Sequence, residues 1–159
     1  MSYQAVILTV SDSCAAGTRT DTSGPAIRAM LENAGFAVQA MQTVPDEEWQ
    51  ISAAIVHACD ILQADLVVTT GGTSLSPRDV TPEATLAVLD REIRAIPVAM
   101  WVEGLKSTPR AMLSRAVAGT RGHTLVLNVP GSEKAARENL RAVVATLDHA
   151  LRMLAGGGH

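Results

Sequence analysis

The chain is 159 residues long, with 47% hydrophobic and 18% charged residues, and it has only two Trp, one Tyr and one Phe. These values are typical of one globular domain with an aliphatic core, and they exclude a disordered chain. The formal net charge of −3 and the scarcity of aromatic side chains argue against a nucleic-acid-binding surface and against a membrane-surface partner.

The amino-terminal half of the chain predicts strands that alternate with helices. The first apolar run is far too short to cross a membrane and predicts a strand. Pro25 and Gly35 frame the first helical pattern, as a first-turn proline and a terminating glycine. Strands are predicted at 5–10, 36–43 and 66–70, and helices at 27–34 and 51–62.

The carboxyl-terminal half continues this alternation. A third helix is predicted to begin with Thr81 as its N-cap, Pro82 in its first position and Glu83 complementing its dipole. The remaining predicted elements are a strand at 125–127, a last helix with a Leu and Val stripe from 140 to 154, and, within 93–118, a short strand, a helix near 98–106 and a second helix near 110–117.

The alternating pattern predicts an α/β fold with a mainly parallel sheet covered by helices on both faces. We expect one domain over residues 1–155, followed by a flexible tail at 156–159. Cys14 and Cys59 belong to no CxxC motif or Cys/His cluster, so we expect reduced thiols and a cytoplasmic location. Ligands of such sheets usually bind beyond the carboxyl ends of the strands, which directs attention to the loops there.

Three strand-to-helix junctions combine glycine with small polar residues. Glycines let a backbone approach phosphate oxygens closely, and Ser and Thr add hydroxyl donors. Turn formation alone would explain any one of these loops, whereas three of them on one sheet edge favour an anion-binding site. The chain lacks G-x-G-x-x-G and G-x-x-x-x-G-K-[ST], which disfavours a generic dehydrogenase or P-loop ATPase. The junctions are 11–25, 70–83 and 128–134.

The second junction carries a longer pattern, Thr70-Gly71-Gly72-Thr73 followed by Arg78-Asp79-Val80-Thr81-Pro82-Glu83-Ala84. This pattern resembles the central signature of the Mog-type molybdopterin adenylyltransferases, which belong to the molybdopterin-binding family. The resemblance covers nearly the whole chain. Its other segments are Ser11-Asp12 with Asp21 and Ser23-Gly24-Pro25, Val44-Pro45-Asp46, Pro109-Arg110-Ala111-Met112-Leu113-Ser114-Arg115, and Asn128-Val129-Pro130-Gly131-Ser132.

The resemblance implies a three-layer α/β/α sandwich that assembles as a homotrimer. It also implies a step of molybdenum cofactor biosynthesis, in which MgATP adenylylates molybdopterin and gives adenylyl-molybdopterin and pyrophosphate. Molybdopterin and ATP are the implied substrates, Mg²⁺ is the implied cofactor, and a downstream molybdenum-insertion enzyme is a candidate partner. Two alternatives stay open: a non-catalytic pterin-binding or scaffolding protein of the same fold, and a phosphohydrolase that acts on compounds such as ADP-ribose.

The resemblance further implies that Asp46 and Asp79 are catalytic and hold Mg²⁺, as carboxylates facing phosphate oxygens commonly do. From their sequence positions alone, Asp46 would cap a helix, and Asp79 would pair with Arg78 or stabilise a turn. The implied pterin- or nucleotide-binding residues are Ser11, Asp12, Ser23, Gly71, Gly72, Thr73, Ser74, Arg78, Glu83, Ser114, Arg115, Asn128, Pro130, Gly131 and Ser132.

Ser74 departs from the family pattern, which usually has a glycine at this position. If the position requires a positive φ, a serine there would be strained by roughly 1 kcal/mol or more; alternatively, its hydroxyl adds a phosphate contact. Without the resemblance, Glu83 would be a surface residue that complements a helix dipole, and a solvated role for Arg110 is as plausible as a ligand contact. Trp49 and Trp101 are interpreted as packing or subunit-contact residues.

Overall fold

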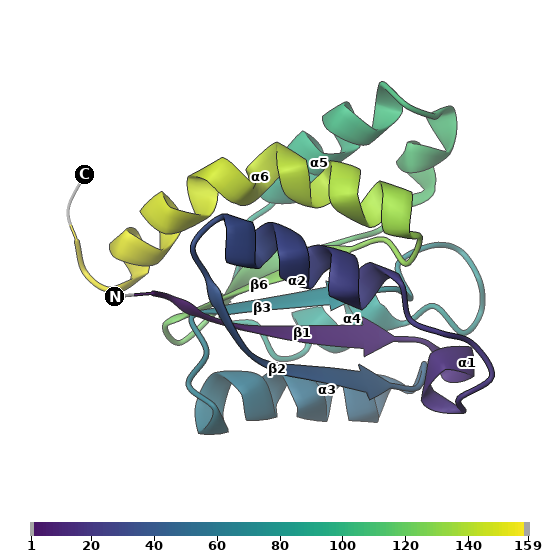
Figure 1. Ribbon diagram of the computed structural model, residues 1–159, viewed down its shortest axis with the longest axis horizontal. Coiled ribbons are helices and arrows are strands. Elements are labelled where there is room, and N and C mark those ends of the chain that lie inside the picture. Colours follow the sequence, from purple (N-terminus) through teal and green to yellow (C-terminus); the bar gives the residue numbers. More distant parts are fainter. Residues whose placement is uncertain (1, 158–159) are drawn as a thin grey trace.

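Six strands form one sheet in the order β2-β1-β3-β6-β5-β4 (Figure 1). The computed structural model describes residues 2–157. β1, β2, β3 and β6 run parallel, whereas β5 pairs antiparallel with both β6 and β4 at one edge, so the prediction of a mainly parallel sheet is confirmed. The strands are β1 (Gln4–Val10), β2 (Ala37–Val44), β3 (Leu66–Thr70), β4 (Arg91–Glu92), β5 (Ala118–Arg121) and β6 (Thr124–Val129).

Helices cover both faces of this sheet. In Figure 1, α2, α5 and α6 lie above the sheet and α3 lies below it. The three-layer α/β/α architecture is thereby confirmed. The helices are α1 (Asp12–Ala15), α2 (Ser23–Asn33), α3 (Glu48–Val56), the π-helical turn η1 (His57–Ile61), α4 (Thr81–Leu86), α5 (Ala95–Leu105), the 3-10 turn η2 (Pro109–Leu113) and α6 (Glu133–Leu154).

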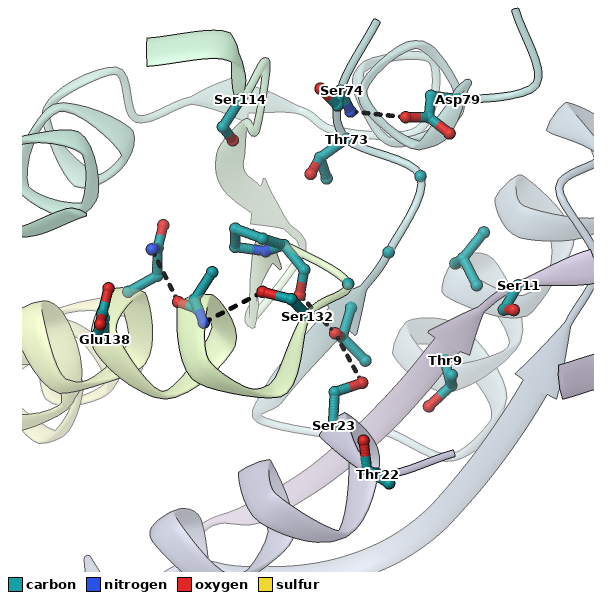
Figure 2. A pocket seen from close by; sticks show the side chains of 18 of the residues that line it. Thr9, Ser11, Thr22, Ser23, Thr73, Ser74, Asp79, Ser114, Ser132 and Glu138 are labelled. Atoms are coloured by element: carbon teal, nitrogen blue, oxygen red, sulfur yellow. Dashed lines mark hydrogen bonds between the residues drawn. The ribbon is translucent and has the colours of Figure 1, made fainter. Parts of the chain in front are cut away.

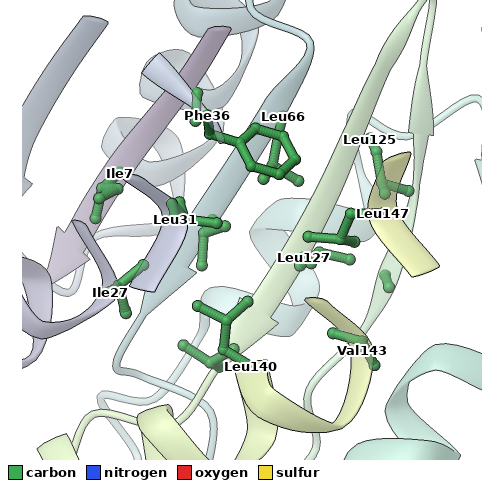
Figure 3. Close-up of a cluster of buried hydrophobic side chains, with 14 of the residues drawn as sticks. Ile7, Ile27, Leu31, Phe36, Leu66, Leu125, Leu127, Leu140, Val143 and Leu147 are labelled. Atoms are coloured by element: carbon green, nitrogen blue, oxygen red, sulfur yellow. The ribbon is translucent and has the colours of Figure 1, made fainter. Parts of the chain in front are cut away.

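Two aliphatic clusters hold the layers together because successive strand residues point to opposite faces. Ile7 and Leu127 face α2 and α6 and pack with Leu140 (Figure 3), whereas Leu8 and Val67 belong to the cluster on the α3 side. These side chains are fully buried, and the burial of each stabilises the folded state by roughly 1.5–3 kcal/mol relative to an exposed position. The sheet therefore offers a rigid base for the loops at its carboxyl edge.

The strand register brings the three glycine-containing junctions together. Thr9 of β1 lies opposite Thr70 of β3, and Thr70 lies opposite Val129 of β6. Each strand ends within one residue of these positions. The loops that follow therefore start from neighbouring points on one sheet edge, as the sequence predicts.

The segment between residues 93 and 118 differs in part from the prediction. α5 is present, but the second helix predicted near 110–117 is wrong: only the five-residue turn η2 forms. The chain becomes extended at Ser114, and Arg115 N donates to Thr73 O at 2.7 Å, which ties the segment to the neighbouring loop. Strand β5, which the prediction missed, pairs with β6 across a tight turn at Gly122.

Smaller outcomes concern the cap of α4, the cysteines and the tail. The N-cap of α4 is Val80 rather than Thr81, because the Thr81 hydroxyl donates instead to Gly71 O at 2.9 Å. Cys14 and Cys59 are both free thiols, as expected. Of the tail expected at 156–159, residues 158 and 159 lie outside the described residues. No helix in the described part of the chain is long and apolar enough to cross a membrane.

Candidate functional site

A cavity of about 700 Å³ opens at the carboxyl edge of the parallel strands. This volume lies within the range of small-molecule sites. Residues from all three junctions line it, and Figure 2 shows Ser11 after β1, Thr73 and Ser74 after β3, and Ser132 before α6 around the same space. Of the site residues predicted from the sequence, the cavity wall contains Ser11, Ser23, Asp46, Gly71, Gly72, Thr73, Ser74, Asp79, Ser114, Pro130, Gly131 and Ser132.

Gly71 and Gly72 form the floor where β3 ends, and both require glycine. Their φ angles are +103° and +67°, which L side chains rarely adopt. A Cβ on Gly71 would also collide with the Val10 carbonyl oxygen, and one on Gly72 would collide with the Thr81 hydroxyl. The bare backbone here can therefore approach a ligand phosphate closely, as the sequence pattern predicts.

Hydroxyl groups connect the three junctions beneath the cavity. Thr70 Oγ1 donates to Pro130 O at 2.7 Å and lies 3.2 Å from Ser23 Oγ (Figure 2). Thr9 Oγ1 donates to Asp21 Oδ2 at 2.7 Å, and Gly24 N donates to the other oxygen of the same carboxylate at 3.0 Å. These bonds join β1, β3, β6 and the start of α2 into one preorganised wall.

Asp46 lies in the cavity wall and exchanges hydrogen bonds with Asp12. Asp12 N donates to Asp46 Oδ2 at 2.8 Å, and Asp46 N donates to Asp12 Oδ1 at 2.9 Å. Arg78 binds both oxygens of the Asp12 carboxylate, because its Nε donates to Oδ2 at 3.1 Å and its Nη2 donates to Oδ1 at 3.0 Å. The same Nη2 lies 3.0 Å from Glu47 Oε1. The helix cap expected from position alone is not formed by Asp46, because the N-cap of α3 is Glu47.

The surroundings of the two carboxyl groups shift their pKa values in opposite directions. Burial raises the pKa of Asp46 above its ordinary value, and the charges of Asp12 and Asp79 raise it further, against the hydrogen bond from Asp12 N–H and the charge of Arg78. The hydrogen bond from Arg78 lowers the pKa of Asp12. Asp46 is thus the carboxyl group of the pair that gains a proton first as the pH falls.

Asp79 also faces the cavity, where its Oδ2 accepts a hydrogen bond from Ser74 N at 2.9 Å (Figure 2). It is therefore a turn-stabilising carboxylate, one of the two alternatives open from the sequence. The other alternative, an ion pair with Arg78, is not formed, because Arg78 pairs with Asp12 and Glu47. Asp46 and Asp79 together place two carboxylates on one wall beside the glycine floor.

Ser74 shows none of the strain considered for its position. Gln63 is the one non-glycine residue with a positive φ within the described range 2–157, so Ser74 adopts an ordinary conformation. Its hydroxyl lies 3.4 Å from Leu113 O, and its backbone N–H donates to the Asp79 carboxylate. Serine is therefore compatible with this loop geometry.

Five predicted site residues do not line the cavity: Asp12, Arg78, Glu83, Arg115 and Asn128. Asn128 is completely buried. Its Nδ2 donates to Thr69 Oγ1 at 2.8 Å and to Thr85 Oγ1 at 3.1 Å, while its Oδ1 accepts from Val117 N. In this structure it fastens β6 to β3 and α4 instead of facing the cavity.

The sequence did not predict the part of the cavity formed by α5 and the body of α6. Its apolar wall contains Met100 and Trp101, and its polar wall contains Glu138 and Asn139. The indole Nε1 of Trp101 is buried without a hydrogen-bond partner among the described residues. These positions resemble ordinary amphipathic helix residues in sequence, and only tertiary packing brings them to the site.

Two arginines also line the cavity, and neither has a carboxylate within 4.0 Å in the described part of the chain. The sequence left Arg110 open between a solvated role and a ligand contact, whereas it did not predict Arg19 as a site residue. Arg19 lies in the loop between α1 and α2, where no recognisable motif marks it. The cavity therefore combines the carboxylates of Asp46 and Asp79, two unpaired arginines and exposed backbone donors, a set that suits ligands carrying phosphate groups.

Comparison with known proteins agrees with this chemistry. Residues 6–149 match a family described as "Probable molybdopterin binding domain". The chain is 36% identical over 154 residues to molybdopterin adenylyltransferase from Helicobacter pylori (strain J99), covering 94% of this chain and 86% of that protein. It is 39% identical over 149 residues to the molybdenum cofactor synthesis protein cinnamon from Drosophila melanogaster, covering 93% of this chain.

The chain spans only 25% of the length of cinnamon, so that relative contains much that this chain does not. Among solved structures, the molybdopterin biosynthesis enzyme MoaB from Thermus thermophilus is similar with a TM-score of 0.92 and 49% identity, covering 97% of each chain. The two chains therefore have the same fold over nearly their whole lengths.

Proposed function

Because the chain belongs to the molybdopterin-binding domain family, we propose that it is a molybdopterin adenylyltransferase of molybdenum cofactor biosynthesis. In the proposed reaction a terminal phosphate oxygen of molybdopterin attacks the α-phosphorus of ATP. The bond from that phosphorus to the β-phosphate bridge breaks, and pyrophosphate leaves. The products are adenylyl-molybdopterin and pyrophosphate.

One observation carries this proposal: Asp46 and Asp79 face the same cavity beside the bare backbone of Gly71 and Gly72. Transfer of an adenylyl group brings two anions together, so catalysis depends on positioning and on charge neutralisation. The glycine floor offers backbone donors to phosphate oxygens, and Arg19 and Arg110 offer positive charge. Met100 and Trp101 of α5 add an apolar wall, against which a flat heteroaromatic ring can pack.

Asp46 and Asp79 fit a magnesium ion that arrives with the nucleotide. Mg²⁺ usually takes one or two protein carboxylates and completes its shell with phosphate oxygens and water. The donor set agrees with this mode, because the described residues hold no group of three or more His, Cys, Asp or Glu that would form a separate all-protein site. When bound, the ion would neutralise charge between the two phosphates.

Further parts of the proposal concern the assembly, the location and the partner. We propose a homotrimer, supported by an apolar stripe on the outer face of α5 at Val98, Val102 and Leu105, each 45–57% exposed. A cytoplasmic location is supported by the free thiols of Cys14 and Cys59. A molybdenum-insertion enzyme that consumes the product remains the candidate partner.

The deciding experiment incubates the purified protein with molybdopterin and MgATP and measures pterin-bound AMP and pyrophosphate. We expect both products from the wild-type protein. Asp46→Asn and Asp79→Asn should each lower the rate by about 100-fold or more, since each removes several kcal/mol of charge stabilisation. Asp148→Asn, in an exposed ion pair on α6, is the matched control and should keep full activity.

Other outcomes would select other functions. Tight pterin binding without an adduct, by a folded protein, would support the non-catalytic binding or scaffolding role. Hydrolysis of ADP-ribose without any need for pterin would support a phosphohydrolase. Adduct formation that survives both aspartate substitutions would remove these carboxylates from the mechanism.

A further inference from the structure

Arg115 lies outside the cavity wall, yet it makes more polar contacts than its surface position suggests. Its backbone N donates to Thr73 O at 2.7 Å, and its side-chain Nε donates to Ser74 O at 2.8 Å. Its Nη2 donates to Asp79 O at 2.7 Å. One residue therefore holds the first two residues and the last residue of the loop 73–79.

This loop carries Asp79, and its internal bonds depend on the same geometry. Ser74 N donates to Asp79 Oδ2 at 2.9 Å, and Asp79 N donates to Ser76 O at 2.8 Å. Arg115 binds the carbonyl groups of Ser74 and Asp79 from outside the loop. The carboxylate of Asp79 is thus fixed by Ser74 on one side and, through its own backbone, by Arg115 on the other.

Glu83 completes the arrangement from the first turn of α4. Its two carboxylate oxygens accept from Arg115 Nη1 at 2.8 and 2.9 Å. A planar guanidinium has donors pointing in several fixed directions, so one Arg115 side chain can reach two carbonyl groups and a carboxylate at once. A lysine ammonium has no such fork, and it would keep the charge but lose part of this set.

We propose that Arg115 is a positioning residue that sets the Asp79 carboxylate for catalysis, with Glu83 orienting its guanidinium. The catalytic consequence rests on the function proposed above, whereas the effect on the loop does not. This role differs from the direct pterin or phosphate contact that the family resemblance implies for Arg115. The guanidinium donates to the loop and to Glu83, and the residue lies outside the cavity wall.

The test uses Arg115→Lys and measures both amide hydrogen exchange and adenylyl transfer. We expect faster exchange of the Ser74 and Asp79 amides, a roughly 10- to 100-fold lower kcat, as for outer-shell partners elsewhere, and a higher Mg²⁺ concentration at half-maximal rate. Pterin binding should change less than about threefold, because Arg115 does not line the cavity. Glu83→Gln should change amide exchange, kcat and the Mg²⁺ requirement in the same directions, but by less. It provides a second test of the proposal if the lysine variant does not fold.

Arg152→Lys is the matched control, because Arg152 forms an exposed ion pair with Asp148 on α6. It should change neither exchange nor rate. Unchanged exchange of the Ser74 and Asp79 amides in both test variants would overturn the positioning role. Faster exchange with an unchanged kcat and Mg²⁺ requirement would overturn it as well. A wild-type protein that makes no adduct would instead contradict the proposed function, while the exchange data would still report on the loop.

Discussion

At the scale of single residues, the reciprocal hydrogen bonds between Asp12 and Asp46 hold two carboxylates near each other and give the site a specific response to pH. Asp46 has a raised pKa because of its burial and because of the negative charges of Asp12 and Asp79. If Asp46 must be ionised for adenylyl transfer, activity is lost as the pH falls through that raised pKa. The acid limb of the rate profile should therefore lie above the ordinary titration range of aspartate.

Asp12→Asn should move this acid limb to lower pH. The substitution keeps the backbone N–H that donates to Asp46 Oδ2 and an amide oxygen that can accept from Asp46 N. It removes the negative charge that raises the pKa of Asp46 and leaves Arg78 with one carboxylate fewer. The measurement is kcat/KM against pH for wild type, Asp12→Asn and the distant control Asp148→Asn. A limb that stays in place, or moves upward, would show that the Asp12 charge does not govern Asp46.

Which residues face the cavity was predictable only where a local pattern marks them. Asp46, Asp79, Gly71 and Gly72 belong to sequence motifs, and the structure places all four in the wall. The contacts of Arg78 with Asp12 and of Arg115 with Glu83 cross 66 and 32 residues of chain. No spacing rule reveals such partners, so the supporting roles of Arg78, Arg115 and Asn128 emerge from tertiary structure alone.

At the scale of elements, the end of β3 depends on Gly71 for two separable reasons. Its φ of +103° disfavours any L side chain, and a Cβ there would meet the Val10 carbonyl oxygen of β1. Gly35 provides a matched comparison, because its φ is +95° but a Cβ would meet nothing within 4 Å. Only the second reason distinguishes the two positions.

Gly35→Ala should therefore destabilise the protein by about 1–2 kcal/mol, the cost of a left-handed backbone. Gly71→Ala should cost about 1–3 kcal/mol more, because the strand ends must move apart. Urea unfolding followed by circular dichroism gives both free energies of unfolding. Equal losses for the two variants would show that the β3 end accommodates a methyl group, and that its close approach to β1 is not essential.

Most elements were predictable because their signals are local. Continuous apolar runs identify β1 and β3, the Leu and Val stripe identifies α6, and Gly35 marks the end of α2. The failures lie at 110–121, where η2 stops after five residues and β5 follows. Arg115 pairs there with the loop after β3, and β5 gains its strand character from pairing with β6. Such non-local pairing overrides local helix propensity.

At the scale of the whole molecule, the convergence of the three loops follows from a general rule for parallel sheets, whose carboxyl ends meet at one edge. The surface is less predictable, because an exposed apolar residue looks the same in sequence as a buried one. Val98, Val102 and Leu105 recur at helical spacing along the exposed face of α5, and Met112 and Leu113 of the adjoining η2 are also exposed. Contiguous exposed apolar side chains of this kind commonly mark protein–protein contacts.

Val102→Asp should therefore disrupt the proposed homotrimer, because burying an unpaired carboxylate in an apolar interface costs several kcal/mol. Val102 is 57% exposed in the single chain, so the substitution should leave the fold of the monomer intact. Light scattering after size exclusion should give about three times the 16.7 kDa chain mass for wild type and a single chain mass for the variant. Ile61→Asp, 69% exposed in η1 at a distance from the α5 stripe, is the control and should remain trimeric. A monomeric wild type would contradict the homotrimer, and loss of assembly in Ile61→Asp alone would move the interface to the surface around η1.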